Sequence, residues 1–166
     1  MEEDVSAIEA GAARLLGVEV RRLGPLPEPD YAFDVRRGQY SSVAVMRAFA
    51  AAAPAGDAKV VGICERDLFI PMLTFVFGQA QLGGRLAIVS LARLRQEFYG
   101  LPADRTAFLS RALKEVAHEV GHTFGLAHCP DQACSMSVST DIRQVDGKRA
   151  EYCRSCAAVV RELTAR

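Results

Sequence analysis

The three histidines of the chain lie within eleven residues, at a spacing that suits a single metal ion. His118 and His122 are four residues apart, so on a helix they share one face and can bind one ion. Neutral imidazole is a common zinc ligand. His128 would lie ~15 Å beyond His118 if the helix continued, so the chain must turn back. Gly125 stands where that turn is needed, because glycine tolerates the positive φ of many helix ends.

Glu119 directly follows the first histidine and is the candidate catalytic residue. Three protein ligands leave a fourth zinc position for water, whose pKa then falls to about 7. Glu119 is placed to take a proton from this water and to pass it to a leaving amine. The pattern therefore predicts peptide-bond hydrolysis by zinc-bound water. The alternative is that His-Glu-x-x-His occurs by chance in an ordinary helix. This is improbable, because all three histidines of the chain stand at ligand spacing.

Four cysteines form a second candidate metal site, because they fall in two close pairs just after the histidines. The pairs are Cys129 with Cys134 and Cys153 with Cys156, with 18 residues between them, as in many zinc ribbons. Four thiolates fill the coordination shell of zinc, so this site is expected to be structural and to pin an irregular tail. A disulfide pair or inert thiols are the alternative. The two sites together predict two zinc ions per chain, one catalytic and one structural.

Residues 118–156 resemble the archaemetzincin family of metzincin zinc metalloproteases. The long His-Glu-x-x-His-x-x-Gly-x-x-His signature is followed directly by a cysteine, then by x4-Cys-x-Met and a distant Cys-x-x-Cys. The stretch Val76-Phe-Gly78 is also similar to that family. The resemblance implies a zincin-like fold and a peptidase. It also implies that Met136 is the Met-turn residue, an apolar floor beneath the catalytic metal. By composition alone, Met136 would be an ordinary core methionine.

Metzincins bind the substrate backbone along an edge strand, and the resemblance leads us to look for that strand upstream of the metal-binding helix. We assign it as a hypothesis to Gly84–Leu91, within which the proposed substrate-binding residues are Leu86, Ala87, Ile88, Val89 and Ser90. An ordinary core strand is the alternative for this apolar run, and the sequence favours neither strongly.

Hydrophobic periodicity and turn residues predict alternating helices and strands, and hence an α/β or α+β fold with a mixed twisted sheet. We expect helices at residues 3–16, 42–53, 105–124 and 154–163. We expect strands at residues 18–23, 59–64, 73–77 and 84–91. The chain is expected to form one catalytic domain with an upper subdomain, residues 1–125, and a lower zinc-stapled subdomain, residues 126–166.

Composition narrows the classes of partner and location. The 166 residues are 50% hydrophobic, and 20 basic side chains balance 20 acidic ones, so nothing points to nucleic acid or a membrane surface. The acidic start lacks the features of a secretory signal. We expect a cytoplasmic monomer that acts on peptide or protein substrates. The competing functional hypothesis is a non-catalytic zinc-binding module whose four-cysteine tail mediates protein contacts.

Overall fold

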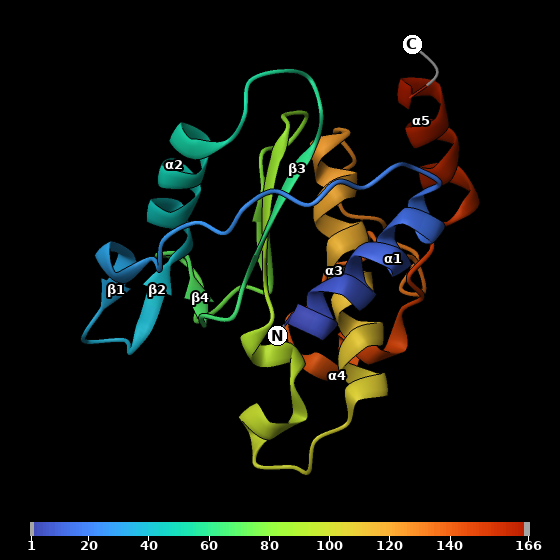
Figure 1. The fold of residues 1–166 in the computed structure, drawn as a ribbon. Helices are drawn as coiled ribbons and strands as arrows, with labels where there is room; N and C mark the ends of the chain where they lie inside the picture. Colours follow the sequence, from blue (N-terminus) through green and yellow to red (C-terminus); the bar gives the residue numbers. More distant parts are fainter. Residues whose placement is uncertain (1, 165–166) are drawn as a thin grey trace.

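A computed structural model describes residues 2–164 and shows a small mixed sheet between two layers of helix (Figure 1). Helix α2 (Ser42–Ala52) covers one face of the sheet, whereas α1 (Glu2–Leu16) and α3 (Arg105–Thr123) cover the other. After α3 the chain is mostly irregular, with the short helix α4 (Ile142–Gly147) and the terminal helix α5 (Arg154–Thr164). The predicted fold class, a mixed α/β fold, is confirmed.

Strand β6 (Leu86–Ser90) is the central strand of the main sheet. It pairs in parallel with β3 (Val60–Cys64) and antiparallel with β5 (Gly78–Ala80), which gives the order β3-β6-β5. All five residues of β6 are buried, because helices cover both faces of the sheet. A strand in this position needs an unbroken apolar run rather than an alternating one, as Leu-Ala-Ile-Val provides.

A second sheet of three very short strands lies beside α2. Its strands are β1 (Phe33–Asp34), β2 (Gln39–Ser41) and β4 (Leu68–Phe69), in the order β1-β2-β4. Ser41 ends β2 and caps α2, since its hydroxyl accepts a hydrogen bond from the Ala44 N–H at 3.3 Å. The cap explains why α2 starts where the sequence predicted a helix.

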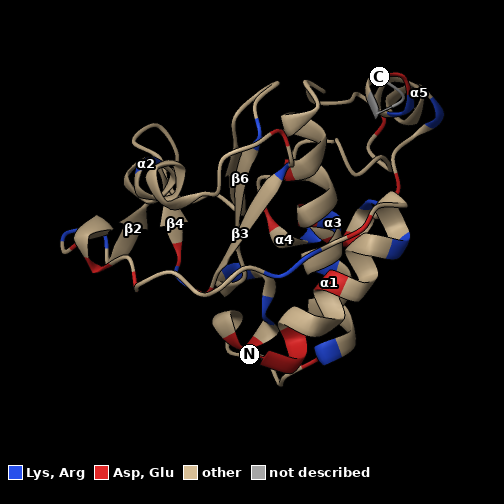
Figure 2. Ribbon diagram, turned by 45° about the horizontal axis from the view of Figure 1, so that its top comes forward, with Lys and Arg blue, Asp and Glu red and all other residues tan. Residues whose placement is uncertain are grey.

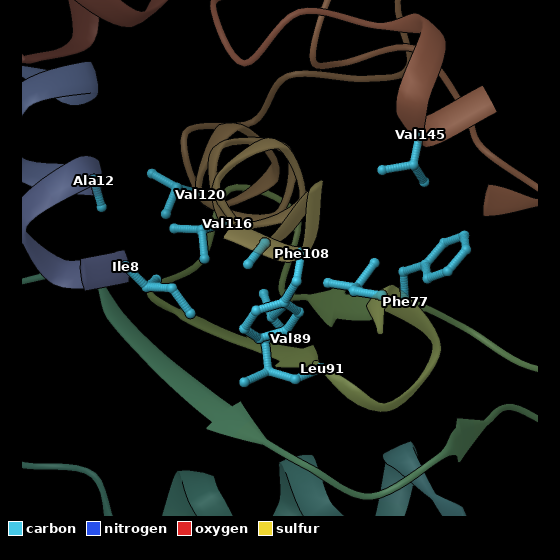
Figure 3. Packing of buried hydrophobic residues seen from close by; sticks show 11 residues of the cluster. Ile8, Ala12, Phe77, Val89, Leu91, Phe108, Val116, Val120 and Val145 are labelled. Atoms are coloured by element: carbon cyan, nitrogen blue, oxygen red, sulfur yellow. The ribbon is translucent and has the colours of Figure 1, made fainter. Parts of the chain in front are cut away.

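Helix α1 packs along α3 and completes the largest apolar cluster, which Figure 3 shows from close by. Gly11 of α1 lies where the two helices approach most closely, because a Cβ there would come within 2.6 Å of the Leu113 side chain. The first turn of α1 is acidic (Figure 2). Asp4 in that turn forms ion pairs with Arg95 at 3.1 Å and Arg105 at 3.0 Å. These contacts fix the outer layer on the helix that carries the histidines.

Two predicted strands are wrong. Residues 18–23 run in an extended connection between α1 and β1, and residues 19–28 form no backbone hydrogen bond within the described chain. Arg22 turns back instead to pair with Glu9 at 2.6 Å, and Pro25 and Pro27 remove two backbone donors from the segment. Residues 73–77 contribute only an isolated bridge between Val76 and Leu68. The observed strand, β5, begins at Gly78, directly after the predicted one.

The other predicted helices and strands lie within a few residues of their expected places. The sequence did not predict β1, β2, β4, β5 or α4, whose lengths of two to six residues leave little periodicity to detect. No helix in the described part of the chain is long and apolar enough to cross a membrane.

Candidate metal centre

Helix α3 carries His118, Glu119 and His122 in its C-terminal half. The helix starts at a cap in which the Asp104 carboxylate accepts a hydrogen bond from the Ala107 N–H at 2.9 Å. It ends at Thr123, and Gly125 then adopts a φ of +85°, which reverses the chain. This turn returns His128 to the other two histidines, so that one ring nitrogen from each lies within 4.8 Å of the others.

Two backbone carbonyls set the orientation of the imidazoles. Nδ1 of His118 lies 2.8 Å from the Ser135 carbonyl oxygen, and Nδ1 of His122 lies 2.7 Å from that of Leu126. Each Nδ1 must therefore carry the proton, which leaves each Nε2 with a free lone pair. The two Nε2 atoms are 3.1 Å apart. Two lone pairs facing each other at this distance repel unless a cation lies between them, so the arrangement fits a metal ion.

Burial keeps these imidazoles neutral. Desolvation lowers the pKa of His118 to about 3, and it also lowers the pKa of His122. Neutral imidazole is the form that binds metal, so little proton competition is expected at pH 7. His128 is exposed. The site is therefore closed beneath His118 and accessible beside His128, as a centre that receives a substrate must be.

The carboxyl group of Glu119 lies against the edge strand β5. The side chain is only 5% exposed, and no hydrogen bond to its carboxyl oxygens is found among residues 2–164. Burial, reinforced by the nearby Glu115, raises the pKa of Glu119 well above its usual value. A Cβ on Gly78 would lie 2.6 Å from Oε1 of Glu119. Glycine in this strand therefore makes room for the carboxyl group.

Met136 lies beneath α3 and is completely buried. Its sulfur occupies the space that a side chain on Gly121 would need. The backbone around it forms a tight turn, in which the Ser137 N–H donates to the Cys134 carbonyl at 3.0 Å. The N–H of Cys129 donates to the Met136 carbonyl at 2.9 Å. Gly121 thus allows the turn to approach α3 closely, beside the helical histidines.

The four predicted cysteines come together at one point. The sulfur atoms of Cys129, Cys134, Cys153 and Cys156 lie within 4.8 Å of one another. The Cys153 N–H also donates to Sγ of Cys134 at 3.2 Å. A set of four sulfur donors at this spacing fits a zinc ion with a closed coordination shell. Cys64 ends β3 and lies outside this cluster.

The structure contradicts one predicted part of the site. Both edges of Leu86–Ser90 are occupied, by β3 on one side and by β5 on the other. Residues Leu86, Ala87, Ile88, Val89 and Ser90 therefore cannot pair with a substrate backbone, and the core-strand alternative is correct. In the described chain, β5 pairs only with β6, so its other edge is open. The sequence prediction missed β5 because three residues, one of them glycine, carry no strand signal.

Several residues that support the site were also missed. Ser135 supplies its backbone carbonyl, which no side-chain pattern can reveal. Tyr152 adjoins Cys153, so we did not expect it at the active site; its hydroxyl donates to the Ala117 carbonyl at 2.7 Å and braces the cysteine-rich segment against α3, a role that the sequence did not predict. Gly78 and Gly121 act by having no side chain. For Gly121, the available signal was a glycine within a predicted helix; Gly78 directly follows the predicted strand 73–77 and gave no such signal.

The fold and the two donor sets define a zinc metallopeptidase of the metzincin class. A family model described as peptidase family M54 matches residues 33–162, and the chain belongs to that family. It is 44% identical over 128 residues to the archaemetzincin of Methanocaldococcus jannaschii, which covers 77% of this chain and 69% of the relative. It is 40% identical over 153 residues to the archaemetzincin of Pyrococcus horikoshii, covering 90% of this chain and 81% of the relative.

Solved structures of archaemetzincins share the fold. The crystal structure of the Methanopyrus kandleri protein matches with a TM-score of 0.84 and 38% identity, covering 99% of this chain and 88% of that one. The Archaeoglobus fulgidus protein, crystallised in complex with malonate, matches with a TM-score of 0.82 and 30% identity, covering 96% and 93%. The resemblance seen in the sequence is confirmed, and the chain is a zinc metalloprotease of the archaemetzincin family.

Proposed function

We propose that His118, His122 and His128 hold the catalytic zinc ion and that Glu119 is the general base, and then the general acid, of peptide-bond hydrolysis. The convergence of the histidine nitrogens, with two of the imidazoles held by carbonyl oxygens, carries the proposal. Glu119 adjoins the first ligand on the same helix. A non-catalytic zinc module would need neither an accessible ligand such as His128 nor a neighbouring carboxylate.

The chemistry divides between the metal and the protein. Zinc bound at such a site supplies a Lewis acid that acidifies water and polarises a carbonyl group. Glu119 accepts a proton on its carboxylate and delivers it to the nitrogen of the leaving amine. Burial raises the pKa of Glu119, which favours holding the proton between these two transfers.

The open edge of β5 is the proposed binding site for the substrate backbone. A peptide in extended form can add to this edge as a further strand, with backbone hydrogen bonds that do not depend on sequence. Gly78 lies in this strand and contacts the Glu119 carboxyl group. A peptide bound along β5 would therefore pass directly beside the proton-transferring group. Strand β5 thus takes the substrate-binding role that the sequence had led us to assign to β6.

The four cysteines are proposed to hold a second, structural zinc ion, which gives two zinc ions per chain. Cys129 directly follows His128, so an ion at the cysteine cluster would also restrain the third histidine. We also propose a division at Gly125 into an upper subdomain, residues 1–125, and a lower one, residues 126–166. The buried cluster of Leu126, Cys134 and Met136 supports treating the second part as a unit with its own small core.

Digestion of a diverse peptide library, followed by mass spectrometry, tests the catalytic proposal. The wild type and Glu119→Gln would be compared after the zinc content of both has been measured. We expect two zinc ions in each protein, cleavage by the wild type, and a loss of about 10²–10⁴-fold in rate in the variant. Cleavage that survives in Glu119→Gln would reject the role of Glu119. A wild type that binds both ions and cleaves nothing would favour the binding-module hypothesis.

A further inference from the structure

A buried ion pair lies under the metal centre and has no part in the proposed chemistry. Nζ of Lys148 is 2.9 Å from Oε1 of Glu115. The Lys148 side chain is 0% exposed and that of Glu115 is 3% exposed. Lysine and glutamate are almost never buried this completely unless they are paired, because removing a charge from water costs several kcal/mol. Hydrophobic residues of similar size would be at least as stable, so the pair calls for another explanation.

The pair connects α3 to the turn that orients His118. Glu115 lies on α3, one turn before His118. Lys148 also donates to the Ser137 carbonyl at 3.3 Å, and Ser137 closes the turn that starts at Cys134. Within this turn, Ser135 offers its carbonyl oxygen to His118 Nδ1 at 2.8 Å. The Lys148 ammonium group therefore links α3 to the Cys134–Ser137 turn. This link lies close to the contact between the Ser135 carbonyl and His118 that orients the imidazole.

A second link holds the same segment from another side. Tyr152 donates its hydroxyl to the Ala117 carbonyl of α3, and the Ser135 N–H donates to the Glu151 carbonyl at 3.2 Å. These contacts anchor the segment beside Ser135, but neither of them involves Ser137. Among residues 2–164, Lys148 is the side chain that hydrogen-bonds to the Ser137 carbonyl, whereas Met136 holds the turn to α3 by apolar packing alone.

We propose that Lys148 and Glu115 are positioning residues of the catalytic centre, which hold the Cys134–Ser137 turn against α3 so that the Ser135 carbonyl presents His118 to the metal. This proposal rests on the proposed function, in which His118 is a ligand. Groups that orient a metal-binding histidine typically contribute 10–100-fold to metal affinity. The pair acts through Ser135 and does not itself touch the substrate or the metal.

Two other roles make different predictions. If the pair acted through its charge, removal of the Lys148 ammonium would strengthen zinc binding, because a positive charge near a cation is unfavourable. If the pair served stability alone, any equally destabilising change on the same face of α3 would have the same effect. Arg111 provides that comparison, since it pairs with Asp146 at 2.6 Å about one turn further from the histidines and contacts neither Ser135 nor Ser137.

The variants are Lys148→Met, Glu115→Gln, the double variant and Arg111→Met as control. Zinc affinity of the three-histidine site would be measured by competition with a chelator of known affinity, beside zinc stoichiometry and thermal unfolding. We expect Lys148→Met and the double variant to bind the histidine-site zinc about 10–100-fold more weakly. The double variant should stay folded, because it leaves no unpaired buried charge. Arg111→Met should lose stability and keep the affinity of the wild type.

Unchanged or tighter zinc binding in the folded double variant would overturn the proposal. An equal loss of affinity in Arg111→Met would also overturn it, since the effect would then follow stability alone. These outcomes differ from a failure of the proposed function. That failure would appear as a missing second zinc ion in the wild type, or as an unchanged zinc content when His118 is replaced.

Discussion

The parts of the molecule before and after Gly125 are held together by different forces. The first part has an extensive apolar core, built mainly from α1, β6, α3 and the segments between them, to which α4 of the second part adds Val145. In the second part, the buried apolar residues of the local cluster are Leu126, Cys134 and Met136, and partly buried cysteines pack around them. Polar contacts such as Lys148 with Glu115, and Tyr152 with Ala117, supply much of the remaining order.

This difference shows how a catalytic centre can be placed between two kinds of structure. His118, Glu119 and His122 belong to a helix that the apolar core fixes, whereas His128 and the Ser135 carbonyl belong to the segment that polar contacts and the proposed cysteine-bound zinc ion hold. The geometry of the site therefore depends on both. Changes that disturb only one part should separate folding of the core from binding of the metal.

Replacing Cys153 by serine should produce the largest effect and should act on the second part alone. Structural zinc contributes about 10–16 kcal/mol of apparent binding free energy in small zinc modules, and this is lost with a ligand. We expect one zinc ion fewer per chain, together with rapid hydrogen exchange and proteolysis after Gly125, while α1 and α3 remain protected. Metal analysis and hydrogen exchange measured by mass spectrometry would check this.

Cys64→Ser is the matched control for that change, because Cys64 lies outside the cysteine cluster. It should keep both zinc ions and normal exchange. Undiminished zinc content in Cys153→Ser, or loss of protection in α1 at the same time, would show that the two parts are not held independently.

Replacing Leu91 by alanine should destabilise the apolar core and leave the metal sites intact. Leu91 is 1% exposed and belongs to the core between the sheet and the helices (Figure 3). A Leu→Ala change in a core costs about 2–5 kcal/mol, which corresponds to a fall in Tm of roughly 5–15 °C for a domain of this size. Both zinc ions should stay bound at 25 °C. Calorimetry with metal analysis measures the two quantities, and early zinc loss would contradict the separation.

The sequence predicted which histidines and cysteines come together, because residues that can bind metal are few, chemically distinctive and constrained in spacing. His118, His122, His128 and the cysteine pairs could be found without any knowledge of the core. The predicted helices were also found, since apolar residues recur along them over several turns. Both kinds of signal are carried by side-chain type, which a sequence shows directly.

The missed features depend on the backbone or on tertiary partners. The orienting carbonyl of Ser135 has no sequence signature, and Lys148 would be taken for a surface residue until its partner is known. The strand at Gly78–Ala80 is too short to detect, whereas Leu86–Ser90 carries a strong strand signal that cannot say whether the strand is central or at an edge. Residues 18–23 have the composition of a strand, but no other strand of the described chain pairs with them.

Gly78→Ala tests, by adding a single methyl group, whether the edge strand β5 positions the Glu119 carboxyl group. The new Cβ would force the Glu119 carboxyl group to move, and misplacement of a catalytic group by about 1 Å can cost about 10²-fold in rate. We expect kcat to fall by about 10–100-fold with both zinc ions retained. Peptide cleavage assays with metal analysis would measure this. Ala80→Gly, the converse change in the same strand, should have a much smaller effect, and equal losses would indicate a damaged strand instead.

Asp4→Asn should have the smallest effect and no effect on the metal sites. Partial burial raises the pKa of Asp4, but hydrogen bonds from Arg95 and Arg105 outweigh it and leave the pKa below its usual value. A lowered pKa in the folded state means that the carboxylate stabilises the protein above its unfolded pKa of ~3.9. This contribution is lost as the pH falls through the lower, folded value.

The ion pairs of Asp4 are partly exposed, so the variant should be less stable by under about 1 kcal/mol at pH 7. The difference should shrink as the pH falls below ~3.9, because Asp4 is then protonated in the unfolded wild type, and it should vanish once the pH passes the lower pKa of the folded state. Urea unfolding of both proteins across this range would measure it. A constant difference at all pH values would mean that Asp4 acts through packing rather than charge. Altered zinc affinity would mean that the outer helix reaches the metal centre through α3, and the two parts of the molecule would then be coupled through the core.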